Sequence, residues 1–193
     1  MSRPQEYDRI LVLEQAMRLF WSKGYEATSL GDLLAETGLS KSSLYAVFGS
    51  KRGLFLEAFD AYRAERVTEM NRILATGSGR EGLEAFFTAI ISDASAVGFH
   101  NGCMSINQAV ELAPRDKDIQ TRVVNDLAVI EDALTITIER GVSDGSIVSK
   151  MPSRDLAQLF VTAFPGFQVM VRASANRNRL ETALRVMLAC CDA

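Results

Sequence analysis

The chain has 193 residues, of which 48% are hydrophobic and only 4 are prolines, and this is enough apolar material for a packed core rather than a disordered chain. The formal net charge of -3 provides no general attraction to nucleic acid, although it is compatible with a local basic face. The 3 cysteines do not form a disulfide framework and the start MSRPQEYDR is polar, unlike a signal peptide, so we expect a cytoplasmic protein that does not bind membranes.

Apolar residues recur mainly at spacings of three and four, which predicts an all-α protein. The first helix is expected from about Tyr7 to Lys23 and ends before Gly24. Its apolar stripe is expected to contain Ile10, Leu13, Met17, Phe20 and Trp21.

The stretch from Thr28 to Phe48 predicts two short helices joined by a tight turn. Ser29 is a candidate N-cap, and Asp32 three residues later completes a capping box. Gly38 can adopt the left-handed conformation that ends a helix, and Ser40 can cap the next helix. This order of caps and turn is typical of a helix-turn-helix.

The second helix of this pair, Lys41–Phe48, would turn Leu44 and Phe48 toward a small core and leave its other side open. A helix of this size fits the major groove of duplex DNA. There its N-terminal residues can contact base edges through hydroxyl hydrogen bonds or through apolar contact with thymine methyl groups.

The same region is locally basic, because no acidic residue occurs between Glu36 and Glu57. Lysine and tyrosine side chains can reach phosphate oxygens, and so can the backbone amides at capped helix starts. The DNA-binding candidates are Thr28, Ser29, Ser40, Lys41, Ser42, Ser43, Tyr45 and Lys51.

The remaining chain predicts six more helices, which makes about nine in all. Ser50 caps the first of them, which runs toward Arg72, and the stretch ATGSGREG from Ala75 to Gly82 is a candidate linker. The other helices are expected at about Leu83 to Gly98, Cys103 to Leu112, Asp116 to Ser143, Ser153 to Ala173 and Asn176 to Cys191. The last two are more apolar than a solvent-facing pair requires, which either a subunit interface or burial within the monomer explains.

The segment from Ile10 to Phe59, above all FWSKGYEATSLGDLLAETGLSKSSLYAVFGSKRGLF, resembles the N-terminal domain of the TetR family of bacterial transcriptional regulators. The resemblance implies a three-helix operator-binding domain in residues 1–50. It also implies a helical ligand-sensing and dimerisation domain in residues 51–193 and a homodimer through the last two helices. Val47 and Gly49 depart from the family, which often has histidine and proline at these positions.

Two features predict how a ligand is sensed. Cys103 begins a helix, where the helix dipole favours a thiolate, and it resembles a cysteine that senses reactive compounds in some branches of the family. A small buried hydrophobic residue is the alternative interpretation. The candidate residues of an apolar ligand pocket, for which solid core is the alternative, are Phe86, Phe87, Ile90, Phe99, Cys103, Asn107, Phe164 and Phe167.

The predicted function is a dimeric DNA-binding transcriptional regulator, a repressor that a small-molecule or electrophile inducer releases from a palindromic operator. One alternative is a helical interaction module without DNA binding. The other is a cysteine-dependent enzyme that uses Cys103 and His100, but the single histidine and the absence of a triad or a phosphate-binding glycine loop argue against it. No metal site is expected at Cys190 and Cys191, which lack a third ligand, and no cofactor is expected.

Overall fold

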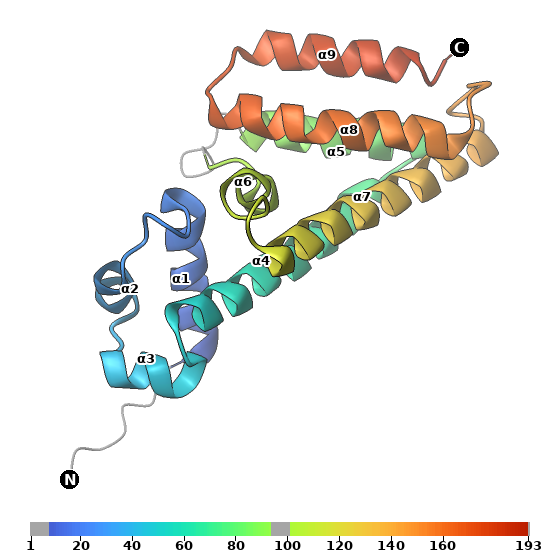
Figure 1. Cartoon of the computed structure of the whole chain (residues 1–193). Coiled ribbons are helices and arrows are strands. Elements are labelled where there is room, and N and C mark those ends of the chain that lie inside the picture. Colours follow the sequence, from blue (N-terminus) through green and yellow to red (C-terminus); the bar gives the residue numbers. More distant parts are fainter. Residues whose placement is uncertain (1–7, 94–100, 193) are drawn as a thin grey trace. The chain divides into compact units, whose positions relative to one another are not determined.

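The computed structural model describes residues 8–93 and 101–192, and all regular structure in these ranges is α-helical. The predicted all-α fold class is therefore confirmed, and the described residues contain the nine helices labelled in Figure 1. The helices are α1 (Arg9–Lys23), α2 (Leu30–Thr37), α3 (Lys41–Phe48), α4 (Lys51–Leu74), α5 (Gly79–Asp93), α6 (Met104–Glu111), α7 (Lys117–Asp144), α8 (Ser153–Arg172) and α9 (Arg177–Ala189).

Polar N-caps fix several of the helix starts. The carboxylate of Asp8 accepts hydrogen bonds from the backbone N–H groups of Ile10 and Leu11, so α1 begins two residues after the predicted position. Ser50 accepts a hydrogen bond from the backbone N–H of Gly53 at 3.0 Å, which confirms the predicted cap of α4. Asp116 caps α7 through the N–H groups of the following turn.

The predicted linker from Ala75 to Gly82 is wrong for its second half, because α5 already begins at Gly79. Gly82 is a buried helical residue, and a Cβ atom there would lie 2.3 Å from the carbonyl oxygen of Leu74. The small residues therefore permit a close approach of α4 and α5 instead of providing a flexible connection. The guanidinium of Arg140 donates to the carbonyl of Leu74 at 2.6 Å and further ties this turn to α7.

Backbone contacts divide the chain into two compact units, Met1–Glu65 and Arg66–Ala193, and the division falls within α4. The first unit has an aromatic core in which the ring of Phe55 lies 5.1 Å from the ring of Phe20 and 4.7 Å from that of Tyr25. Phe59 stacks on Phe55 at 5.7 Å. The buried residues of α1 are Val12, Ala16 and Phe20.

The predicted apolar stripe of α1 is right for Phe20, which is buried, but wrong at the start of the helix. Ile10 is 70% exposed, whereas Val12 and Ala16, which were outside the predicted stripe, are buried. Hydrophobic residues occur on nearly every side of this helix, so that spacing alone does not select the inner side. Contacts with the rest of the first unit, such as the Phe20 ring against Phe55 of α4, select that side.

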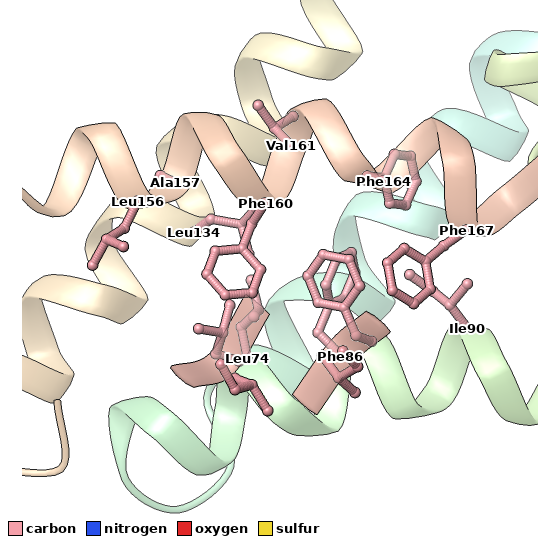
Figure 2. Close-up of a cluster of buried hydrophobic side chains, with 14 of the residues drawn as sticks. Leu74, Phe86, Ile90, Leu134, Leu156, Ala157, Phe160, Val161, Phe164 and Phe167 are labelled. Atoms are coloured by element: carbon pink, nitrogen blue, oxygen red, sulfur yellow. The ribbon is translucent and has the colours of Figure 1, made fainter. Parts of the chain in front are cut away.

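The second unit has a core built from α5, α7, α8 and α9, with Met70 and Leu74 at the end of α4. Within it α8 packs against α5, α6, α7 and α9. Figure 2 shows how Leu134 of α7 and the rings of Phe86, Phe160, Phe164 and Phe167 meet in this core. Over the described residues, no helix is both long enough and apolar enough to cross a membrane.

Candidate nucleic-acid interface

Local hydrogen bonds that the sequence predicts fix both ends of α2 and the start of α3. The hydroxyl of Ser29 accepts from the N–H of Asp32 at 3.1 Å, and the Asp32 carboxylate accepts from the N–H of Ser29 at 2.8 Å, so the capping box is present. Gly38 ends α2 at φ 66° and donates its N–H to the carbonyl of Leu34. Ser40 caps α3 by accepting from the N–H of Ser43 at 3.1 Å.

Two buried side chains hold the back of α3. Leu44 is 0% exposed and Phe48 is 6% exposed, whereas the remaining side of the helix faces solvent. The exposed residues of α3 are Lys41, Ser42, Tyr45 and Ala46, and Ser43 and Val47 are half-buried. The side of α3 that the sequence predicts for DNA is therefore open to solvent within the first unit.

Serine hydroxyls cluster at the start of α3. The Oγ atom of Ser40 shares hydrogen bonds with the hydroxyls of Ser42 at 2.9 Å and Ser43 at 2.8 Å. A hydroxyl has one donor and two acceptor lone pairs, so Ser40 uses all three in these bonds and its cap, whereas the hydroxyls of Ser42 and Ser43 keep further capacity. The cluster presents groups that can hydrogen-bond base edges or phosphate oxygens.

Lys41 and Tyr45 lie one helical turn apart on the same flank of α3. The ammonium nitrogen of Lys41 is 6.0 Å from the centre of the Tyr45 ring, and Tyr45 is 42% exposed. Both side chains are long enough to extend beyond the helix, so this flank can reach a phosphate backbone while the shorter serine side chains stay near the helix axis.

Lys51, the first residue of α4, is fixed by the loop that follows α1. Its ammonium group donates to the carbonyl oxygen of Tyr25 at 2.6 Å and lies 4.3 Å from the centre of the Tyr25 ring. A lysine ammonium has three donors, so two can still serve a phosphate. The sequence did not reveal this contact, because 26 residues separate the two partners.

The start of α2 differs from the prediction. Thr28 is 0% exposed and its hydroxyl donates to the carbonyl of Gly24 at 2.6 Å, so its side chain does not face a phosphate. The N–H and the hydroxyl of Ser29 both donate to Asp32. These bonds and another from Lys23 lower the pKa of the Asp32 carboxyl from 3.8 to about 2, so it is an anion under physiological conditions.

Arg9 supports the position of α3, and it was not identified from the sequence. It forms an ion pair with Glu57 of α4, and its guanidinium lies 5.1 Å from the ring centre of Phe48. Arg9 thus contacts the residue that anchors the back of α3. No local signal indicates this, since 48 residues separate the charged partners.

Five of the eight candidate ligand-binding residues belong to the buried core of the second unit, which Figure 2 shows in part: Phe86, Phe87, Ile90, Phe164 and Phe167. The ring of Phe86 stacks on Phe164 at 6.0 Å, and Phe87 meets Phe167 at 5.2 Å. Ile90 belongs to the same core, and Phe99 lies outside the described residues, as does His100.

Cys103 and Asn107 lie at and near the start of α6. Cys103 is the N-cap residue, half-buried and packed against the core of the second unit, so it precedes the helix by one residue. The Asn107 amide donates to the carbonyl of Asn101 at 2.9 Å, which engages it with the preceding loop. Among the other cysteines, burial raises the pKa of the Cys191 thiol to about 11. The part of the chain that the structure describes contains no cluster of His, Cys, Asp and Glu able to hold a metal ion.

Comparisons with known proteins cover both units. Residues 12–58 match the family model described as "Bacterial regulatory proteins, tetR family", and residues 79–187 match the one described as "Tetracyclin repressor-like, C-terminal domain". The HTH-type transcriptional repressor ComR of Escherichia coli (strain K12) is 32% identical over 180 residues, covering 92% of this chain and 86% of ComR. The uncharacterized HTH-type transcriptional regulator YezE of Bacillus subtilis (strain 168) is 29% identical over 194 residues, covering 100% of both chains.

A solved structure with the same fold contains DNA. It is the TetR family transcriptional regulator CifR, a cysteine mutant complexed with a 26-bp double-strand operator. Its TM-score is 0.85 at 27% sequence identity, and the match covers 97% of this chain and 98% of CifR.

Proposed function

The chain belongs to the TetR family of bacterial regulatory proteins, which are DNA-binding transcriptional regulators, and we propose that it acts as a homodimeric repressor released from its operator by a small molecule. The observation that carries the proposal is the open side of α3, held from behind by Leu44 and Phe48. The similar repressor ComR and the operator complex of CifR support it. We place this action in the cytoplasm, where a bacterial regulator meets its operator.

In this proposal residues 1–50 bind DNA together with Lys51 at the start of α4, and the remainder of residues 51–193 senses the ligand and forms the dimer. Ser42 and Ser43, both bonded to Ser40, hydrogen-bond base edges or nearby phosphates, while Lys41, Tyr45 and Lys51 contact the phosphate backbone. At the start of α2 the phosphate contact comes from the backbone N–H groups of the first helical turn, because the Thr28 side chain is buried and both donors of Ser29 bond to Asp32. Two copies of α3 would read half-sites about 34 Å apart, or somewhat further, in a palindromic operator.

We assign the dimer interface to the outer side of α8 and α9. Their inner residues, such as Phe160 and Leu184, are already buried within the second unit. Apolar side chains nevertheless remain exposed on both helices, with Leu159 at 39%, Val169 at 52% and Val186 at 63% exposure. Burial of these residues between two copies explains an apolar outer surface that a monomer does not need.

We assign inducer binding to the aromatic core of the second unit and to Cys103 beside it. Because the rings of Phe86 and Phe164 stack on each other, a ligand there must displace or extend this packing. An electrophilic inducer would react with the Cys103 thiol instead. In either case the inducer acts only if it favours a state of the dimer that binds DNA poorly, since equal affinity for both states shifts nothing.

Selection of bound duplexes from a random DNA pool tests this function. The regulator is expected to enrich a palindromic sequence, and the Cys103→Ser variant should enrich the same one. Treatment with a thiol oxidant during selection should reduce recovery by the wild type more than by the variant if Cys103 is the sensor. Failure to enrich any duplex at low ionic strength would favour the helical interaction module without DNA binding.

A further inference from the structure

The centre of the open side of α3 follows from the two residues that hold its back. Successive residues of an α-helix are rotated by about 100°, so Ala46, two positions from both Leu44 and Phe48, lies about 200° from each. Leu44 and Phe48 are buried and Ala46 is exposed. Ala46 therefore points directly away from the core of the first unit.

Polar residues surround Ala46 on this side. Ser42 precedes it by one turn, and its hydroxyl is hydrogen-bonded to that of Ser40 at 2.9 Å. Lys41 and Tyr45 occupy the adjacent flank. Of the four exposed residues of α3, alanine alone has a side chain that can neither donate nor accept a hydrogen bond.

Alanine is also the best helix former, and helix propensity alone explains why alanine occurs at many exposed helical positions. At Ala46 the small side chain also affects how closely α3 can approach the bases. Small side chains at Ser42 and Ala46 allow the helix backbone to approach the floor of a groove, whereas the longer Lys41 and Tyr45 stand at its side. The group nearest to the bases would then be a methyl group.

We propose that Ala46 is a specificity-determining residue whose methyl group packs against the 5-methyl group of a thymine in each operator half-site. The inference rests on the proposed function, because it requires α3 to enter the major groove. In that groove thymine is distinguished by its C5-methyl group, and an alanine side chain is a suitable apolar partner for it. The residue was not among the DNA-binding candidates of the sequence, which were chosen for charge or hydroxyl groups.

Replacement of thymine by deoxyuridine tests the proposal, because it removes this methyl group and changes nothing on the hydrogen-bonding edge. In the operator selected from the random pool, each symmetric pair of thymines is replaced in turn and the affinity of the full-length protein is measured by fluorescence anisotropy. Replacement of one of these pairs is expected to weaken operator binding by about fourfold for each half-site, which corresponds to the loss of one buried methyl group. In the Ala46→Gly variant the same replacement should have no effect.

The Ala61→Gly variant is the matched control, since Ala61 is an exposed helical alanine of α4 and loses the same helix propensity. It should keep the full sensitivity to deoxyuridine. The proposal is overturned if no thymine pair matters to the wild type, or if Ala46→Gly stays as sensitive as the wild type; in both cases the unmodified operator is still bound and the proposed function stands. Absence of binding to every duplex would overturn the proposed function, and the role of Ala46 with it.

Discussion

Among single residues, the proposed DNA-binding role of Lys51 depends on the hydrogen-bond donors that its ammonium group still has after bonding to Tyr25. That group donates to the Tyr25 carbonyl at 2.6 Å, which positions the charge at the start of α4 and leaves two donors. If these donors hold a phosphate, Lys51 contributes to binding of every sequence alike, because phosphate contacts carry no sequence information.

The Lys51→Met variant is expected to weaken binding to the operator and to unrelated duplexes by a similar factor. Each lost phosphate contact reduces the slope of log affinity against log salt by about 0.9, so a dimer that loses two contacts should show a slope smaller by about 1.8. Salt titrations by fluorescence anisotropy measure this slope, with Lys51→Arg as the charge-retaining control. An unchanged slope in Lys51→Met would show that the amine serves only Tyr25.

Asp32 gives a prediction on pH. Its pKa is about 2 in the folded protein, below the ordinary value of 3.8, so the folded state favours the ionised carboxylate. The stability that Asp32 contributes is therefore present above about pH 4 and is lost as the pH falls toward 2. Urea unfolding between pH 6 and pH 2 should show Asp32→Asn destabilised at the upper end and level with the wild type at the lower end. A difference that stays constant across this range would contradict the assignment.

Contacts between residues close in sequence were predictable, and contacts between residues far apart in sequence were not. The caps at Ser29, Ser40 and Ser50 follow from local spacing, and all are present. The burial of the Thr28 side chain depends on its bond to Gly24 and on the surrounding core, which no spacing rule conveys.

At the scale of the helices, the junction between α3 and α4 depends on one close contact. Gly53 lies in the first turn of α4, and a Cβ atom there would lie 1.9 Å from the carbonyl oxygen of Phe48. Because the obstacle is backbone, it can yield only by moving the end of α3.

The Gly53→Ala variant is therefore expected to lower the free energy of unfolding by about 1–3 kcal/mol, as overpacking does. Gly31→Ala is the matched control in α2, where the nearest atom to a new Cβ is the Ser29 hydroxyl oxygen at 3.6 Å, an ordinary contact. This control should be neutral or slightly stabilising, because alanine favours a helix more than glycine does. Equal stability of the two variants in chemical denaturation would contradict the tight junction.

The number of helices in the described ranges and most of their ends were predictable, because periodicity, caps and glycines are local signals. The inner side of α1 was not, since apolar residues occur on most sides of that helix and its contacts with the other helices of the first unit decide which side is buried. The linker from Ala75 to Gly82 failed for a related reason, because glycine has the same sequence signature in a flexible segment and in a close helix crossing. The aromatic set of the second unit was predictable as apolar, but the ring-on-ring packing of Phe86 and Phe164 was visible only in the structure.

At the scale of the whole molecule, the proposed dimer makes use of exposed apolar residues on the last two helices. Val169→Glu on α8 is expected to shift the protein from dimer to monomer, because a dimer would bury the new carboxylate without a partner. Light scattering after size-exclusion chromatography measures the mass. Ile136→Glu on α7 is the control, since Ile136 is 66% exposed but lies outside α8 and α9. If Val169→Glu remains a dimer, or if Ile136→Glu is the variant that dissociates, the proposed interface is wrong.

The central claim is that the open side of α3 meets duplex DNA, and the most direct measurement compares one added charge at two exposed alanines. Ala46→Glu places a carboxylate at the centre of that side, and Ala61→Glu places one on α4, about 15 Å along the helix from its start. Repulsion from phosphates costs several kcal/mol, so Ala46→Glu should bind the selected operator at least about 100-fold more weakly than the wild type, with unchanged helix content by circular dichroism. Ala61→Glu should bind within a few-fold of the wild type. Equal operator affinities of the two folded variants would contradict the claim.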